Sequence, residues 1–309
     1  MGFIPGTAQA EPDIEDVQTR VDRLYHEAEQ ASERYNDAKL ELTDLNRDLD
    51  SLEADEARQD DRLEVVREQV QESIVRQYQG EGLSTVGQVV VADDPNAFLA
   101  SLSTMSAFND LQSQLFADYS REVKALDIRS EATEQRADEV AKIEDRLADE
   151  KATIDDKLAE AKSLLGRLEA EERERMTTTS RSSVRTPTVS APASGRAGAA
   201  VQYALAQVGD SYVYGAAGPS AFDCSGLTMM AWAQAGVSLP HSSSAQYASG
   251  TQVAASALQP GDLVFYYNPI SHVGIYIGNG MIAHAANPST GVQVTGLNSM
   301  PYTGAVRPG

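Results

Sequence analysis

The sequence predicts a two-part chain, with an all-α antiparallel coiled-coil hairpin in front and an α+β domain behind. The length of 309 residues suits about two domains. Charge is unevenly distributed. The part from Ala197 onward holds three acidic residues and one basic residue, whereas the part before it holds 43 acidic and 24 basic residues. The part from Ala197 onward, which is nearly uncharged, also contains eight of the twelve tyrosines. Two different kinds of domain are therefore expected.

Composition excludes several functions. The net charge of -21, with no basic patch, argues against a nucleic-acid partner. No apolar run approaches the ~18 residues of a membrane-spanning helix. The only cysteine is Cys224, which excludes an internal disulfide and a zinc site built on a cysteine pair, and no metal or cofactor is expected. A lone cysteine is most often a small buried apolar side chain.

The first residues, 1–12, carry a weak export signal. Ala8-Gln9-Ala10 has the small-residue spacing of a signal-peptidase site, but no basic segment or apolar run precedes it. The match is either chance or the end of a signal peptide whose front is absent. We favour the second reading, a residual leader or disordered start, and expect an exported protein.

Two windows of 67 and 70 residues contain neither Gly nor Pro, one after Pro12 and one after Pro95. They predict helices of roughly 100 Å each at ~1.5 Å per residue, within a coiled-coil domain at 13–176. Apolar steps of three and four form a heptad seam, which is typical of a coiled coil. The first seam comprises Ile14, Val17, Val21, Leu24, Ala28, Ala31, Tyr35, Ala38, Leu42, Leu45, Leu49 and Leu52, falters at Glu56 and Gln59, and resumes at Leu63, Val66 and Val70. The second comprises Val123, Leu126, Ala137, Val140, Leu147, Ile154, Leu158, Ala161, Leu165 and Leu168.

The segment from Gly80 to Pro95 is the expected reversal between the helices. Apolar residues become denser from Asn96 to Phe116 than a two-helix seam requires. We expect short helices near 80–116 that form a local core at the tip of the hairpin. The alternative is an exposed apolar docking site for a partner or for the rear domain.

A linker is predicted at 177–196, where half of the residues are Ser or Thr and two are Pro. Such a composition cannot bury a core and predicts a mobile tether. The rear domain, 197–309, should begin with a helix at 199–208 and continue with a second helix at 225–235. Strands are expected at 263–267, 272–278 and 281–285, with a tight turn at Asn279-Gly280 that pairs residues whose numbers add to 559.

Cys224 is expected at the N-terminal end of the second helix of this domain. The helix dipole and the free N–H groups at such a position favour the thiolate, which is the nucleophilic form of cysteine. A nucleophilic cysteine needs a base, and the base needs an orienting group. His272 and His284, on adjacent strands of the predicted hairpin, are the candidates for these two roles.

The order and spacing of several motifs resemble the NlpC/p60 family of cell-wall cysteine endopeptidases. The motifs are Tyr-Val-Tyr-Gly from Tyr212, Asp-Cys-Ser-Gly-Leu from Asp223, Leu-Pro-His-Ser-Ser from Leu239, Gln-Pro-Gly-Asp-Leu from Gln259 and His-Val-Gly-Ile-Tyr from His272. The resemblance covers roughly Ala199–Arg307. It implies a reduced papain-like fold and hydrolysis of peptidoglycan stem peptides between D-glutamate, or D-isoglutamine, and diaminopimelate.

The resemblance also implies roles for individual residues. Cys224 matches the nucleophile, His272 the base and His284 the residue that orients the base. Tyr212, Asp223 and Ser225 match positions that line the substrate cleft. His241 stands where many relatives have arginine, so a structural role and a substrate-binding role both stay open.

The combination of coil, linker and domain resembles actinobacterial RipC-type hydrolases and, more loosely, division hydrolases controlled by the FtsEX membrane complex. It implies a secreted enzyme of the cell wall or a periplasm-like space, active in wall remodelling and daughter-cell separation. The coil would localise or restrain it, through an intramolecular contact or a membrane partner. Two alternatives stay open: a catalytically silent coiled-coil adaptor that activates other hydrolases, and an amidase or acyl transferase acting on another substrate.

Overall fold

The structure is a computed structural model that describes residues 14–79, 95–167 and 195–309. The predicted leader and nearly all of the predicted linker lie outside these residues. The chain forms two compact units, one comprising 1–41 with 143–309 and the other comprising 42–142. The boundary therefore falls inside the predicted coil, because its first helical turns group with the C-terminal domain.

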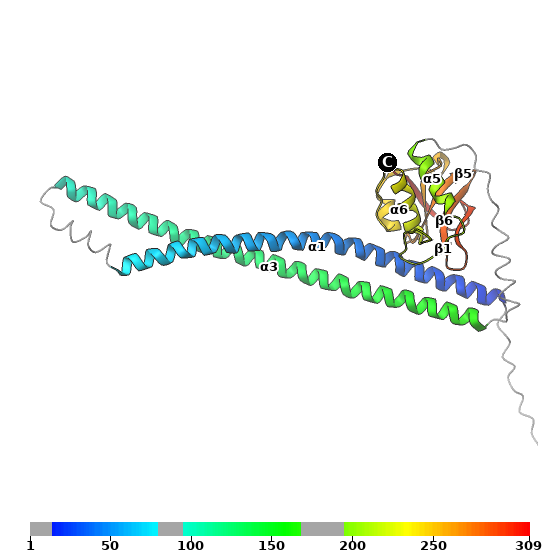
Figure 1. The fold of residues 1–309 in the computed structure, drawn as a ribbon, viewed down its shortest axis with the longest axis horizontal. Coiled ribbons are helices and arrows are strands. Elements are labelled where there is room, and N and C mark those ends of the chain that lie inside the picture. Colours follow the sequence, from blue (N-terminus) through cyan, green and yellow to red (C-terminus); the bar gives the residue numbers. More distant parts are fainter. Residues whose placement is uncertain (1–13, 80–94, 168–194) are drawn as a thin grey trace, which may run out of the picture. The chain divides into compact units, whose positions relative to one another are not determined.

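Two long helices form the N-terminal part, α1 (Ile14–Tyr78) and α3 (Pro95–Arg167), as the sequence predicts (Figure 1). Proline suits the first position of α3, because its missing N–H would have no helical partner there. Since α3 is continuous from Pro95, the expectation of separate short helices is wrong for 95–116; the rest of that segment, 80–94, lies outside the described residues. On α3, Leu111 and Phe116 are exposed. Among the described residues, no helix is both long and apolar enough to cross a membrane.

Within the unit that holds residues 1–41, α1 and α3 run antiparallel. Arg20 pairs with Glu160 and Arg34 with Glu150, both at 2.7 Å. Exposed ion pairs of this kind contribute ~1 kcal/mol or less, so the apolar seam is the main stabilising contact. Its buried residues are Val17, Val21, Leu24, Tyr25 and Ala161, with Leu158, Leu164 and Leu165 packed against them.

In the other unit, the break in the first seam has a structural explanation. Gln59 is buried, and its amide donates to the backbone oxygen and the carboxylate of Glu122 on α3. A polar side chain thus takes a seam position by bonding across to the partner helix. The apolar seam resumes with Val70, which is buried.

The C-terminal domain is built on a six-stranded antiparallel sheet in the order β3-β8-β4-β5-β6-β7. Two short strands, β1 (Ser211–Tyr212) and β2 (Ala221–Phe222), pair in parallel beside it. The sheet strands are β3 (Thr251–Gln252), β4 (Leu263–Tyr266), β5 (His272–Gly278), β6 (Met281–Asn287), β7 (Gly291–Gly296) and β8 (Tyr302–Arg307). The helices are α5 (Arg196–Ala206), α6 (Cys224–Gln234) and α7 (Ser243–Tyr247), with a 3-10 turn, η1 (Ala255–Ala257).

Helices α5 and α6 pack on each other and on β5 and β6 (Figure 1). The core between them and the sheet contains Val201, Trp232, Phe265, Ile275 and other buried apolar side chains. The indole N–H of Trp232 donates to the backbone oxygen of Gly261 at 3.2 Å. This core contains residues of the C-terminal domain alone and fixes α6 against β5.

The β5–β6 hairpin turns at Asn279-Gly280 as predicted, and both residues have positive φ, which this turn requires. The predicted register holds at the turn, where Gly278 faces Met281. The ladder is irregular between Gly278 and Tyr276. From Tyr276 onward, away from the turn, the register is shifted by one residue, so that Tyr276 faces Ile282. A β-bulge of this kind adds a residue to one strand, and a turn motif does not encode it.

Candidate functional site

Cys224 is the first residue of α6, as predicted from sequence, and its side chain is fully buried. Asp223 caps this helix, since its carboxylate accepts from the backbone N–H of Gly226 at 2.6 Å. The same carboxylate accepts from the N–H of Gly215 at 2.9 Å and contacts Nε2 of His241 at 2.7 Å. Asp223 therefore fixes the cap, the glycine-rich loop and His241 around the thiol.

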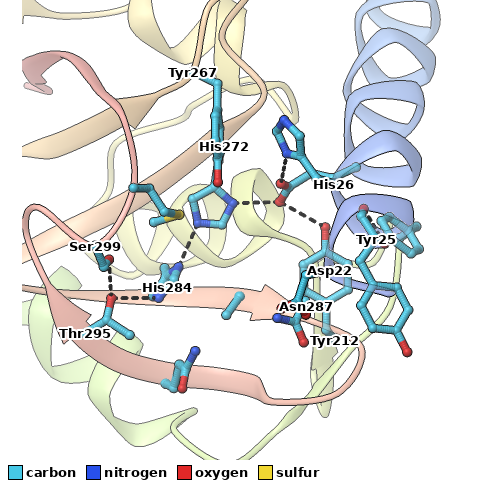
Figure 2. A pocket seen from close by; sticks show the side chains of 15 residues that line it. Asp22, Tyr25, His26, Tyr212, Tyr267, His272, His284, Asn287, Thr295 and Ser299 are labelled. Carbon is cyan, nitrogen blue, oxygen red and sulfur yellow. Dashed lines mark hydrogen bonds and ion pairs between the residues drawn. The ribbon is translucent and has the colours of Figure 1, made fainter. Parts of the chain in front are cut away.

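The two predicted histidines are neighbours in the structure. His272 begins β5 and His284 lies in β6, and Nε2 of His272 is 2.7 Å from Nδ1 of His284. Nε2 of His284 lies 3.0 Å from Oγ1 of Thr295 on β7, and that hydroxyl is 3.2 Å from Oγ of Ser299. Figure 2 shows this chain of polar groups running from His272 through His284 to Thr295 and Ser299.

The pKa of His284 lies well below its usual range because of burial and the adjacent His272. His284 is therefore neutral near neutral pH, with a proton on only one ring nitrogen. If that proton is on Nε2, Thr295 accepts it and Nδ1 offers a lone pair to His272. The arrangement can hold His272 with Nε2 protonated and Nδ1 directed away from His284.

Nδ1 of His272 is 2.6 Å from the carboxylate of Glu29, a residue of α1. Glu29 also receives a longer bond, 3.4 Å, from the hydroxyl of Tyr212, and lies 3.6 Å from Nδ1 of His26. Burial opposes ionisation of Glu29, but the nearby His272 and His26 outweigh it, so its pKa is lowered. The nitrogen that a cysteine would use as its base is thus bonded to a carboxylate of the N-terminal helix.

One turn further along α1, Glu33 reaches the start of α6. Its carboxylate accepts from Oγ of Ser225 at 2.8 Å and from the backbone N–H of Ser243 at 2.5 Å, and lies 3.6 Å from Sγ of Cys224. Burial and the nearby Asp223 raise the pKa of Glu33 to about 7, despite these hydrogen bonds.

The next turn of α1 continues the contact with the C-terminal domain. Asp37 accepts from the hydroxyls of Ser242 and Ser244, the latter at 2.7 Å. The amide of Asn36 donates to Asp223 at 3.3 Å. One side of α1 contacts the part of the C-terminal domain around Cys224 and His272 and is called the cleft-facing side below. It comprises Tyr25, His26, Glu29, Ser32, Glu33, Asn36 and Asp37.

The structure changes one expectation about Cys224. A helix start favours the thiolate, but the pKa of Cys224 is raised well above its usual range. The main cause is burial, followed by the negative charges of Glu33, Glu29 and Asp223. With α1 in contact, the cysteine is therefore a neutral thiol, so the prediction of a favoured thiolate does not hold for this arrangement.

The remaining candidates also lie at this site. Tyr212 is buried on β1, and burial and Glu29 raise its pKa. Ser225 faces Glu33 from the first turn of α6. His241 is bonded to Asp223, and this bond outweighs burial and raises the pKa of His241. The contact supports the structural reading of His241, while its part in substrate binding stays untested.

A cavity of about 330 Å³ remains beside the two catalytic candidates His272 and His284. It is lined by residues of both the C-terminal domain and α1, including Asp22, His26, Tyr212 and Asn287 (Figure 2). The donor atoms of Glu29, Cys224 and His272 lie within 4.8 Å of one another. These three buried side chains are the group of potential metal ligands found among the described residues.

Sequence reasoning missed the contributions of Glu29, Glu33, Asp37 and Thr295. The three acids recur every four residues on one side of α1, but so do many solvated acids of the coil. A more informative signal is the run of small residues, Ala28, Ala31, Ser32 and Ala38, all nearly fully buried. Small side chains let a third element approach a two-helix pair.

Part of this chain is similar to known proteins. Residues 209–306 match the NlpC/P60 family. A probable endopeptidase of Corynebacterium glutamicum is 50% identical over 117 residues, which are 38% of this chain and 56% of that protein. A probable endopeptidase of Mycobacterium tuberculosis is 50% identical over 101 residues, 33% of this chain and 26% of that protein. This chain therefore spans only part of the length of either relative.

A solved structure is also similar to part of this chain. The crystal structure of the NlpC/p60 domain of the peptidoglycan hydrolase SagA has 34% identity and a TM-score of 0.34. The similarity covers 36% of this chain and 97% of that one.

Proposed function

We propose that this chain, whose residues 209–306 form an NlpC/P60 domain, is a peptidoglycan endopeptidase that uses Cys224 as its nucleophile. The observation that carries the proposal is the alignment of three groups. Cys224 begins α6, its Sγ lies within 4.8 Å of a ring nitrogen of His272, and His272 contacts His284 on the adjacent strand. We further propose that it cleaves stem peptides at the D,L-bond between D-glutamate, or D-isoglutamine, and diaminopimelate.

The proposed reaction is acyl transfer. The thiol proton passes to Nδ1 of His272, and the thiolate attacks the amide carbonyl carbon to form a tetrahedral oxyanion. Free N–H groups at the start of α6 stabilise that oxyanion. His272 then protonates the leaving amine, the C–N bond breaks, and a thioester remains. Water, deprotonated by His272, hydrolyses the thioester and regenerates the thiol.

We also propose that α1 inhibits this reaction. The arrangement in which the cleft-facing side of α1 contacts the C-terminal domain is called closed below, and the arrangement without this contact is called open. Glu29 occupies the nitrogen of His272 that must accept the thiol proton, and Glu33 lies over the thiol and Ser225. A stem peptide needs the same space. Release of α1 would free His272 and relieve the negative charge around Cys224, and both effects favour the thiolate.

The wider setting follows from the proposed reaction. Its substrate lies in the cell wall, so we propose that the chain acts after export, in wall remodelling and daughter-cell separation. Release of α1 would be set by a partner of the helical hairpin, for which an FtsEX-type membrane complex is the leading candidate.

Digestion of purified muropeptides tests the peptidase proposal. The wild-type chain, Cys224→Ala and residues 197–309 alone are compared by chromatography of the released fragments. We expect cleavage at the D,L-bond by the wild type, faster cleavage by 197–309, and none by Cys224→Ala. If neither wild type nor 197–309 releases fragments, the chain is better explained as a silent adaptor or an enzyme for another substrate. Equal rates for the two would remove inhibition by α1 and leave localisation as its role.

A further inference from the structure

Glu29, Cys224 and His272 bring a carboxylate, a thiol and an imidazole together at the closed contact. We propose that these three residues bind a divalent cation with the ligand preferences of zinc, and that the ion locks α1 onto the cleft. The proposal rests on the proposed inhibition by α1, because Glu29 reaches the other two residues only in the closed arrangement. The ion would be a regulator and would take no part in hydrolysis.

The donor set is the first argument. Zinc in proteins binds cysteine sulfur, histidine nitrogen and carboxylate oxygen at about 2.0–2.3 Å. The three donor atoms here belong to buried side chains and lie within 4.8 Å of one another. Donors around a tetrahedral ion sit roughly 3.3–3.8 Å apart, whereas Nδ1 of His272 and the Glu29 oxygen are 2.6 Å apart. Glu29 must therefore withdraw by about 1 Å, which a change of its side-chain torsions supplies.

Charge is the second argument. Glu29, Glu33 and Asp223 are all buried around Cys224. Among the described residues, the ion pairs of these carboxylates are with histidines, namely His26 and His272 for Glu29 and His241 for Asp223. Buried carboxylates without a fixed positive partner are costly. A divalent ion supplies that charge at the centre of the cluster.

The surroundings of the three ligands are the third argument. A histidine that binds a metal through one ring nitrogen usually donates a hydrogen bond from the N–H of the other to a neighbouring acceptor, which fixes the ring. Nε2 of His272 already faces Nδ1 of His284 at 2.7 Å, which leaves Nδ1 of His272 for an ion. The 330 Å³ cavity reaches both Glu29 and His272, and it offers an entry path and room for water as a fourth ligand.

Binding can be written with protons balanced. The S–H bond of Cys224 breaks, a metal–sulfur bond forms, and the thiol proton goes to solvent. The proton that His272 Nδ1 shares with Glu29 also goes to solvent, so that His272 binds through Nδ1 as the neutral form protonated on Nε2 and Glu29 binds as the carboxylate. Because the complete ligand set exists only when α1 is closed, an ion at 100 times its dissociation constant would raise the closed-to-open ratio about 100-fold. The same ion would remove the nucleophile and the base from catalysis.

Cobalt(II) titration of the metal-free 309-residue chain tests the proposal, because a bound thiolate gives cobalt a charge-transfer absorption. We expect one ion per chain with this absorption, and displacement by zinc. Glu29→Gln should weaken binding at least tenfold, and Cys224→Ser should abolish the thiolate band. Glu53→Gln makes the same change at an exposed position of α1 and should bind like the wild type. Circular dichroism shows whether each variant keeps its helices.

Two results would overturn the metal site. One is the absence of a thiolate band in the wild type. The other is an unchanged affinity in Glu29→Gln, since Cys224 and His272 would then hold the ion without α1. Muropeptide cleavage by the same variants in chelator is a separate measurement of inhibition. If Glu29→Gln cleaves faster in chelator but binds cobalt normally, inhibition stands and the metal site fails. If Glu29 controls cobalt affinity while cleavage rates do not change, the contact exists but does not inhibit.

Discussion

The bond between Glu29 and His272 can be removed by Glu29→Ala without changing any group of the C-terminal domain. In the closed arrangement this carboxylate is 2.6 Å from Nδ1 of His272, and both side chains are buried. In the proposed open arrangement, without the α1 contact, the same nitrogen would be available to Cys224. The substitution should therefore favour the open, active arrangement.

The size of the effect follows from the kind of bond. A hydrogen bond to a charged group contributes about 1.5–3 kcal/mol. The contacts of Glu29 with Tyr212 and His26 are longer, at 3.4 and 3.6 Å, and add less. Since 1.4 kcal/mol corresponds to a factor of ten, the open-to-closed ratio should rise roughly 10- to 100-fold.

The effect is measured by comparing the initial rates of muropeptide cleavage by the wild type and by Glu29→Ala in the presence of chelator. Because α1 and substrate compete for one cleft, the gain should appear as a lower apparent KM, with kcat nearly unchanged. Glu53→Ala, an exposed acid further along the same helix, should match the wild type. An unchanged kcat/KM in Glu29→Ala, or a gain confined to kcat, would refute competition by α1.

Three further outcomes are expected. In the closed arrangement, burial and the nearby Asp223 raise the pKa of Glu33 to about 7. Protonated Glu33 therefore stabilises this arrangement fully below its ordinary pKa of 4.5, and the contribution is lost as the pH rises through about 7. Glu33→Gln keeps a neutral group there, so its cleavage rate at pH 8 should stay several-fold below that of the wild type. Thr295→Val removes the acceptor for Nε2 of His284 and should lower kcat roughly 10- to 100-fold in a Glu29→Ala background, with KM unchanged. Thr295→Ser keeps the hydroxyl and should restore the rate. Equal rates for the Val and Ser variants would show that the hydroxyl does not orient His284. Asp262→Ala removes the carboxylate that accepts from Arg307 and from the N–H of Gln259, and leaves Arg307 only its bond to the backbone oxygen of Ala257. It should destabilise the C-terminal domain by about 2 kcal/mol, visible as a lower Tm, whereas Asp262→Asn should cost less because it can still accept from Gln259.

The sequence was most informative where local signals determine the structure. Long windows without Gly or Pro predicted α1 and α3, and Asn279-Gly280 predicted the turn that brings β5 and β6 together. The helix start at Cys224 and the adjacent strands of His272 and His284 followed from the same local patterns. The motifs then added the resemblance that suggested their roles.

The sequence was least informative where distant segments meet. No strand was predicted at β7 or β8, so Thr295 on β7 was not linked to His284. The Glu29–His272 contact joins residues 243 positions apart. On a helix rich in acidic residues, Glu29 and Glu33 look like solvent-facing charges, and only a tertiary contact reveals their burial.

The two sides of the first turns of α1 differ in what they bury. Val17, Val21 and Leu24 pack toward α3, whereas the cleft-facing side carries mostly carboxylate, amide, hydroxyl and imidazole groups, with Tyr25 as its aromatic member. The proposed separation of α1 from the domain would therefore expose mainly polar groups of this helix to water. The proposed opening would therefore add little aggregation-prone surface to the helix, which suits a contact that opens and closes repeatedly.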